Sequence, residues 1–304
     1  GRDPTGTERV LSEAQASFES GTATAQVAFN LPAELQARIS RFAVKGATHA
    51  GAVLLTDDSL KRREIALVSG RENREGLELL SPLHYLEKAL VASSDLLQGA
   101  LSVTLTGNPD VVIMADIAEL NESDEQALTA WVERGGLLVR FAGPRLAASE
   151  ISRNEEHPLM PVRLRAGGRI VGGAMSWGEP KALAPFAEGS PFFGLRVNDE
   201  LRVAAQVVAQ PDPQLAKRVI ARLADGTPLV TRKTLGQGQV VLFHISANAE
   251  WSSLPLSGLF VRMLERLSVA TSLAGLQDAE LEGTLWQPVK TLDGFGQLQE
   301  AENL

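Results

Sequence analysis

The stretch "DVVIMADIAELNESDEQALTAWVERGGLLVRFAGPRL", residues 110–146, decides the fold. It opens with an apolar run and closes with another, "LLVRFAG" at 137–143, and both are typical of strands buried on two faces. Between them lies an amphipathic helical pattern whose apolar face contains Leu128, Trp131 and Val132. Two buried strands joined by one helix predict a parallel strand–helix–strand unit.

The limits of this helix are also marked in the sequence. Ser123 and Gln126 have the spacing of a capping box, in which each side chain bonds the other residue's backbone N–H at a helix start. Gly135 is the residue type that most easily adopts the left-handed conformation just after a helix. We therefore expect a helix over residues 123–134.

Strands and helices alternate on both sides of this unit. Upstream, "EIALVSG" at 64–70 predicts a buried strand, "SPLHYLEKALVAS" at 81–93 a helix, and "LSVTLTG" at 101–107 an alternating strand. Downstream, "QVVLFHIS" at 239–246 is apolar enough to rejoin the central sheet, and 255–271 predicts a final helix. The apolar stripe of that helix contains Leu256, Leu259, Phe260, Met263, Leu264 and Leu267. The expected fold is α/β, with a doubly wound, mostly parallel sheet.

The outer segments have a different pattern. Residues 22–32 and 37–46 show the alternation of half-exposed antiparallel strands, and with the apolar stretch 50–58 they predict part of a β-sandwich whose beginning is missing. Residues 150–235 lose the strand–helix alternation and predict a β-rich insertion made of ribbons. The expected domains are a partial β-sandwich, an α/β domain and a polar tail, over residues 1–60, 61–275 and 276–304.

Composition excludes several classes of function. The formal net charge is -8 and the basic residues are scattered, so a nucleic-acid partner is not expected. The chain has no cysteine, which excludes disulfides, thiolate metal sites and cysteine nucleophiles. No apolar run approaches the roughly 20 residues that span a bilayer. We expect this chain itself to be soluble.

Motifs for cofactors and metals are weak. The glycine-rich stretch 167–173 lacks the Gly-Lys-Ser/Thr ending of a phosphate loop, and 119–125 lacks the spacing of a calcium-binding loop. The histidines His49, His84 and His157 are too widely separated to indicate a zinc site. No serine lies in a Gly-x-Ser-x-Gly elbow, so a serine hydrolase is not supported. We expect neither a cofactor nor a metal.

Two segments carry a resemblance to a known family. Residues 110–146 resemble the strand–helix–strand unit of class I glutamine amidotransferase-like domains. "GQGQVVLFHISANAEWSSLPLSGLFVRMLERL", residues 236–267, is similar to the closing strand and helix of that domain in membrane-anchored bacterial proteins related to BatA. The resemblance covers about residues 64–272, and its most specific part is "AEWSSLPLSGLF" at 249–260. It implies an amidotransferase- or flavodoxin-like sheet.

The resemblance also implies where a catalytic site would lie. In active members, the turn after the strand equivalent to 137–143 carries the cysteine nucleophile in a Gly-x-Cys-x-Gly elbow. With Gly143 as the second glycine, Phe141 takes the place of the cysteine, and a phenyl ring cannot attack a carbonyl. His244 falls at the family's catalytic histidine, but Ile245 and Ser246 replace the proline and glutamate that follow it. Glutaminase activity is therefore not expected.

What remains is a candidate relic cleft without its nucleophile. Its residues are Phe141, Ala142, Gly143, His244, Ser246, Asn248 and Glu250. His244 has two interpretations, a general base or ligand within this cleft and a packed histidine at a strand end.

The sequence thus supports two hypotheses about function. The first is a non-catalytic binding or structural module, a pseudoenzyme, in a bacterial cell-envelope protein. Its partners would be the remainder of the same polypeptide or other envelope proteins, and it would reach the membrane only through segments outside this chain, on the periplasmic face of the inner membrane. The second is an enzyme or ligand sensor that uses the cleft around His244 on a small molecule or glycan.

Overall fold

The chain forms two compact units, Gly1–Arg62 with Leu276–Leu304, and Arg63–Gly275. A computed structural model describes residues 1, 7–18, 20–25, 27, 29, 31, 33–36, 38–56, 62–70, 81, 83–165, 169–170, 179–273 and 290–301. The larger unit carries the segments on which the expected α/β domain and the expected site depend.

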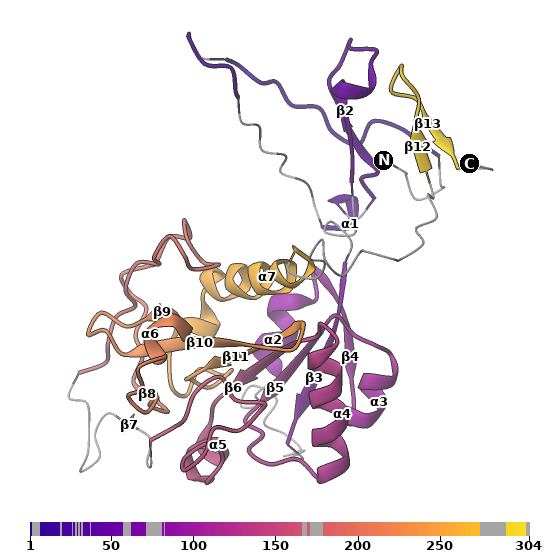
Figure 1. The fold of residues 1–304 in the computed structure, drawn as a ribbon. Helices are drawn as coiled ribbons and strands as arrows, with labels where there is room; N and C mark the ends of the chain where they lie inside the picture. Colours follow the sequence, from indigo (N-terminus) through magenta and orange to yellow (C-terminus); the bar gives the residue numbers. More distant parts are fainter. Residues whose placement is uncertain are drawn as a thin grey trace. The chain divides into compact units, whose positions relative to one another are not determined.

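A seven-stranded sheet forms the centre of the larger unit (Figure 1). In sheet order its strands are β4 (Ser94–Gln98), β3 (Arg63–Ser69), β5 (Val111–Ala115), β6 (Leu137–Phe141), β11 (Gly238–Phe243), β10 (Pro228–Leu235) and β9 (Val219–Arg222). The first five are parallel, and β10 and β9 extend the sheet in antiparallel fashion. The expected α/β fold with a mostly parallel sheet is confirmed.

Helices cover both faces of this sheet (Figure 1). Helices α2 (His84–Leu90) and α7 (Gly258–Leu273) share one apolar cluster with one side of the strands, and α3 (Leu101–Thr106) and α4 (Glu122–Glu133) share another with the opposite side. The parallel strands are buried on both faces, which explains their continuous apolar runs.

Helix α4 confirms the expected buried face and corrects the expected cap. Leu128, Trp131 and Val132 are buried against the sheet. The helix begins two residues earlier than the capping box indicates: the N-cap is Asn121, whose side-chain oxygen accepts the backbone N–H of Asp124 at 2.8 Å. An Asn at the N-cap satisfies an amide that the helix itself leaves unpaired, so Ser123 is not needed for that role.

The expected strand at 101–107 is wrong, because these residues form helix α3. Leu101 and Thr104 lie on its buried side, whereas Val103 is exposed, which is the spacing of a helix. The Thr104 hydroxyl donates to the carbonyl of Leu101 within the same turn. The strand of this region is β4, seven residues earlier in the chain than the expected one, and it forms an edge of the sheet.

Part of the expected β-rich insertion instead belongs to the central sheet. Strands β9 and β10 pair around a turn at Asp225 and Gly226, and β10 then pairs with β11 over Val230–Leu235. The residues before them form short pieces: α5 (Pro144–Ala148), β7 (Arg169–Ile170), β8 (Ala205–Gln206) and α6 (Leu215–Arg218). Most of the glycine-rich stretch 167–173 lies outside the described residues.

The final helix starts later than expected. A short 3-10 turn, Leu254–Leu256, precedes α7, and Leu256 is exposed rather than part of the apolar stripe. The other five residues of that stripe, from Leu259 to Leu267, are buried. Within the described residues, no helix combines the length and apolar character that a membrane crossing requires.

The described residues of the smaller unit contain two hairpins. Strands β1 (Arg41–Ala43) and β2 (Val53–Leu55) pair, and so do β12 (Lys290–Leu292) and β13 (Leu298–Glu300). A four-residue helix, α1 (Ala33–Gln36), lies between the first two expected strand segments. The described residues of 22–32 are not in a strand, and the polar tail contains a hairpin that its composition did not predict.

Candidate functional site

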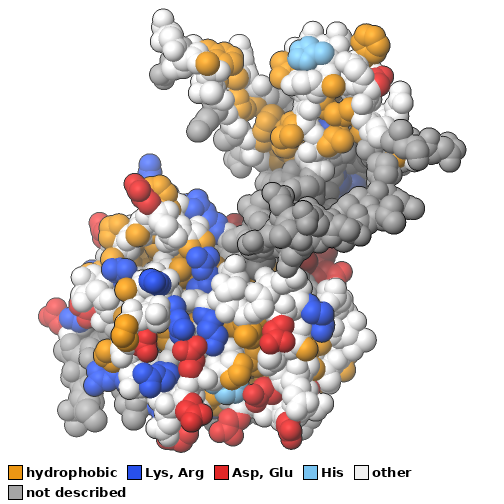
Figure 2. All heavy atoms as spheres, in the orientation of Figure 1, with side chains coloured by type: hydrophobic (Ala, Val, Ile, Leu, Met, Phe, Trp, Pro, Cys, Tyr) orange, Lys and Arg blue, Asp and Glu red, His pale blue; other side chains and the backbone are white. Residues whose placement is uncertain are grey.

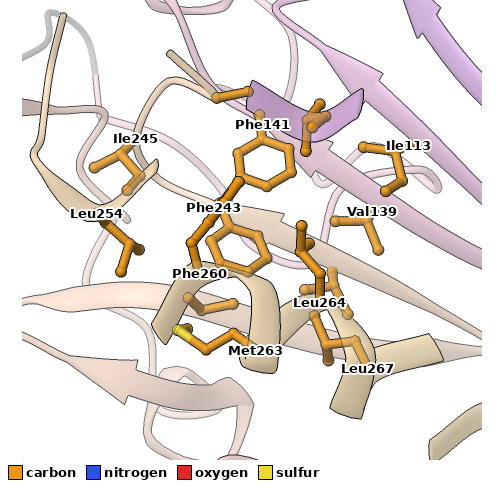
Figure 3. Close-up of a cluster of buried hydrophobic side chains, with 14 of the residues drawn as sticks. Ile113, Val139, Phe141, Phe243, Ile245, Leu254, Phe260, Met263, Leu264 and Leu267 are labelled. Atoms are coloured by element: carbon orange, nitrogen blue, oxygen red, sulfur yellow. The ribbon is translucent and has the colours of Figure 1, made fainter. Parts of the chain in front are cut away.

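Phe141, at the carboxyl end of β6, occupies a closed apolar core. Its ring stacks on that of Phe243 of β11, with centroids 4.5 Å apart and an interplanar angle of 17°, and it meets Phe260 of α7 edge-on at 5.8 Å. Figure 3 shows these rings surrounded by aliphatic side chains from neighbouring strands and α7. Phe141 is 1% exposed, so no reacting group at this position would reach solvent.

His244 follows β11 and is fully buried. Its Nδ1 lies 3.0 Å from the carbonyl oxygen of Val207, and its Nε2 lies 3.0 Å from Oγ1 of Thr231 on β10. A carbonyl can only accept, so Nδ1 carries the proton, and Nε2 must accept the threonine hydroxyl. Burial lowers the pKa of His244 to about 4, partly offset by the bond to Val207. Both ring nitrogens are therefore engaged, and the ring is neutral at pH 7.

Phe141 and His244 do not face each other. In the parallel pairing of β6 with β11, Phe141 is opposite Phe243, and both rings lie on the α7 side. Successive residues of a strand point to opposite faces, so His244 points away, towards Thr231 and Val207. The structure thus separates the two residues that the family resemblance placed in one catalytic group.

The remaining residues of the expected cleft are mostly enclosed. Ala142, Gly143, Ser246 and Asn248 are buried, and Glu250 is exposed. The Ser246 hydroxyl donates to the carbonyl of Asn248 at 3.2 Å, which closes a local turn rather than opening a cavity. Trp251, next to this group, is buried in an apolar cluster as a packing residue.

The strained backbone of this sheet edge lies elsewhere. Gly143 has φ 177° and ψ -175°, which is extended and unstrained, so the turn after β6 is no nucleophile elbow. Asp116, directly after β5, has φ 51°, a left-handed conformation that few side chains other than Asn and Asp tolerate. Local strain of this kind concentrates at functional sites, so Asp116 is a candidate that the motif search missed.

Asp116 binds the start of helix α5. Its Oδ1 accepts the backbone N–H groups of Arg145 and Leu146, each at 3.1 Å. A side chain at Gly143 would collide with the Asp116 carboxyl group, so glycine is needed there for space rather than for its backbone freedom. Burial raises the pKa of Asp116; the two N–H bonds oppose this shift, and Glu250 adds to it.

Charged side chains from several strand ends therefore meet at one edge of the sheet. A side chain at Gly70, which follows β3, would collide with the guanidinium of Arg145, so that cation reaches the end of β3. When the five parallel strands are numbered in chain order from β3 to β11, their order across the sheet is 2-1-3-4-5. This order reverses direction between β3 and β5. Ligands of open α/β sheets bind at this switch point, outside the carboxyl ends of the strands.

Sequence reasoning could have found Asp116 by one signal. It is the first polar residue after the apolar run 111–115, and a carboxylate at the end of a buried parallel strand is placed at the ligand-binding edge. Arg145 carried no comparable signal, because its contact with Gly70 depends on long-range folding.

A buried cation fixes the loop that follows Asp116. Arg140 of β6 is 2% exposed and donates to the carbonyl groups of Ile117, Ala118 and Leu159. Burial lowers its pKa to about 10, so the guanidinium stays charged at neutral pH. Its bonds hold the segment after β5 in one position. Within the described residues, no group of three or more His, Asp or Glu side chains could hold a metal ion.

Comparison with known protein families finds no match, and neither does comparison with curated proteins. Among solved structures, the chain is similar to a β-galactosidase from Bacillus circulans sp. alkalophilus, at 14% identity and a TM-score of 0.47, over 69% of this chain and 31% of that one. A ThuA-like protein from Bacteroides uniformis is similar at 15% identity and a TM-score of 0.44, over 70% of this chain and 90% of that one.

A cytoplasmic protein from Salmonella typhimurium is similar at 9% identity and a TM-score of 0.44, over 69% of this chain and 98% of that one. This chain spans 31% of the length of that β-galactosidase and 31% of another one, from Rahnella sp. R3. Likenesses this distant do not transfer an activity, a substrate or a partner.

Proposed function

We propose that this chain is a non-catalytic binding or structural module of a bacterial cell-envelope protein, built on an amidotransferase- or flavodoxin-like scaffold. The 2-1-3-4-5 order of the parallel strands, which is that of flavodoxin-like sheets, supports the scaffold. The resemblance of residues 249–260 to BatA-related proteins supports membrane anchoring through other segments of a longer polypeptide, on the periplasmic face.

The observation that carries the proposal is the closed environment of His244. A general base must reach the proton that it removes and must bind a proton during the reaction. Here the ring is 0% exposed, both nitrogens have partners inside the protein, and burial disfavours the protonated form. Together with the absence of cysteine, this leaves amidotransferase chemistry without a base or a nucleophile.

A two-part experiment tests the proposal. The imidazole Hε1 resonance of His244, followed by NMR from about pH 8 to about pH 5, should stay at its neutral position, because the pKa lies near 4. Ammonia release from glutamine should equal that of a heat-inactivated control. A His244 resonance that titrates near its ordinary pKa, or ammonia above the control, would overturn the proposal.

A specific observation favours the alternative of a ligand sensor, although at other residues. Asp116 and Arg145 bring opposite charges to the switch point, and Glu250 lies close enough to raise the pKa of Asp116. A small polar molecule such as a sugar would find hydrogen-bonding groups there. Thermal shift with a panel of sugars and amino acids tests this function, and a stabilising compound should lose its effect in the Asp116→Asn variant.

A further inference from the structure

A basic hollow lies at the antiparallel edge of the sheet, and its lining does not include the residues that bond His244. Its volume is about 300 Å³, and it is lined by Lys217 and Arg218 of α6 and by Arg232, Lys233 and Thr234 of β10. On the face drawn in Figure 2, Lys and Arg side chains gather over the part of the larger unit that carries α6, β9 and β10. This concentration contrasts with the net charge of -8 for the whole chain.

The charges in the hollow are only partly balanced. Glu156 accepts from Arg218 at 2.7 Å and from Lys233 at 2.9 Å. Burial disfavours its carboxylate, but these two cations outweigh that effect and hold the pKa of Glu156 below its ordinary value. Within the described part of the chain, the side chains of Arg232 and Lys217 have neither a hydrogen bond nor an ion pair.

Arg232 is the more informative of the two. It is half-buried, and desolvation lowers its pKa. The guanidinium nitrogens still reach solvent, and a carboxylate or phosphate in the hollow would exchange that water for a charge-assisted hydrogen bond. Lys and Arg on an edge strand also hinder unwanted strand pairing, but that role requires only exposed side chains. Arg232 therefore offers a half-buried cation, without a partner among the described residues, that suits an anionic group.

The hollow lies between α6 and a part of β10 that has no second strand beside it among the described residues. The pairing of β9 with β10 ends at Val219 and Thr231, whereas the pairing of β10 with β11 continues to Leu235. In the described sheet, residues 232–235 of β10 thus have a strand neighbour on one side only. An extended peptide can add to such an edge, with backbone hydrogen bonds giving affinity and side-chain pockets giving specificity.

We propose that an acidic, extended segment of a partner protein docks along residues 232–235 of β10 and places a carboxylate between Arg232 and Lys217. This deepens the proposed function by naming the class of partner, and it rests on that function only in treating the chain as a binding module. A peptide fits better than a free anion, because the cations lie beside residues of β10 that β9 leaves unpaired. A nucleic acid fits less well, because its sugar-phosphate backbone has no amide N–H groups that could pair with the edge of β10.

The test measures fluorescence anisotropy with the complete chain and a labelled eight-residue peptide in which Glu alternates with Thr. Two matched probes replace every Glu by Gln or carry N-methyl groups on alternate backbone amides. The protein variants are Arg232→Gln and Lys217→Gln, with Arg196→Gln as the control, because Arg196 is an exposed residue outside the hollow. Circular dichroism verifies that each variant is folded.

The Glu peptide should bind the parent protein. Its affinity should fall about tenfold in Arg232→Gln, about threefold in Lys217→Gln and less than about twofold in Arg196→Gln. The Gln peptide and the N-methylated peptide should each bind at least about tenfold more weakly. Equal binding of the N-methylated peptide, or equally tight binding of inorganic phosphate or a single-stranded oligonucleotide, would overturn the proposal, as would no binding of the Glu peptide. None of these outcomes changes the NMR and ammonia tests of His244, so the two proposals fail separately.

Discussion

The burial of His244 predicts a specific dependence of stability on pH. The neutral ring is held in the folded protein with a pKa of about 4, against an ordinary value of 6.5. As the pH falls below about 6.5, the unfolded chain takes up a proton that the folded chain refuses, so stability decreases with falling pH and levels off below about pH 4. The full contribution is about 3 kcal/mol, of which about 2 kcal/mol is lost by about pH 5.

The non-titrating variant His244→Gln isolates this contribution. Its amide can still reach the hydroxyl of Thr231 or the carbonyl of Val207, so we expect a loss of about 1–3 kcal/mol at about pH 7.5. Other groups with shifted pKa values, such as Asp116 and His157, titrate in parent and variant alike and cancel in the difference. The stability gap should therefore shrink by about 2 kcal/mol between about pH 7.5 and about pH 5.

Urea denaturation at several pH values provides the measurement, with fluorescence and circular dichroism as independent probes. A gap that stays constant across this range would show that His244 titrates as an exposed residue, and the closed-core reasoning would fail. If the variant does not fold, the parent alone still decides the matter, because its His244 Hε1 resonance must remain at the neutral position down to about pH 5.

Three further predictions concern the core and the sheet edge. Trp131→Ala should lower the free energy of unfolding by about 3–5 kcal/mol in urea denaturation, because its ring is buried against the sheet; an unchanged midpoint would show that the ring is exposed. Gly143→Ala should cost about 1–3 kcal/mol, because the new methyl group displaces Asp116 from the α5 amides, whereas Gly189→Ala, where no atom lies within 4 Å, should be close to neutral in the same assay. Phe141→Cys should release no ammonia from glutamine, because a thiol there faces the α7 side; any activity would contradict the strand register.

The sequence predicted the elements whose pattern is local. Strands β3, β5, β6 and β11 are apolar runs because both of their faces are covered, and α4 shows its buried face in its own spacing. Strand β4 is different: it lies at the sheet edge, and its sequence "SDLLQ" mixes polar residues with only two leucines. An edge strand needs no continuous apolar run, so periodicity alone does not distinguish it from a loop.

The elements that the sequence did not predict depend on partners far along the chain. Helix α3 has the alternating pattern of a strand, and only its packing beside α4 decides between the two structures. The pairing of β10 with β11 joins residues expected in an insertion to the central sheet. At the candidate site, the resemblance placed His244 at a strand end, where it does lie, but it could not reveal that Phe141 points to the opposite face.

Strand β10 contributes both to the burial of His244 and to the basic hollow beside Arg232. Without β10, the side of β11 that carries His244 would lie at the edge of the sheet; with it, Thr231 caps the ring. The next residue of β10, Arg232, begins the edge that β9 leaves uncovered. These two consecutive residues should therefore separate the two roles of the strand.

Thr231→Val removes the hydroxyl that His244 accepts but keeps the shape of the side chain, and it should cost about 1–3 kcal/mol of stability. It should leave the affinity for the acidic peptide within about twofold of the parent. Arg232→Gln should have the opposite effects: it should lower the affinity for the acidic peptide and change the free energy of unfolding little. The guanidinium that it removes has no partner within the described residues. If Thr231→Val lowered the affinity for the peptide as much as Arg232→Gln does, the loss would reflect a general distortion of β10. Arg232 would then have no separate role in binding.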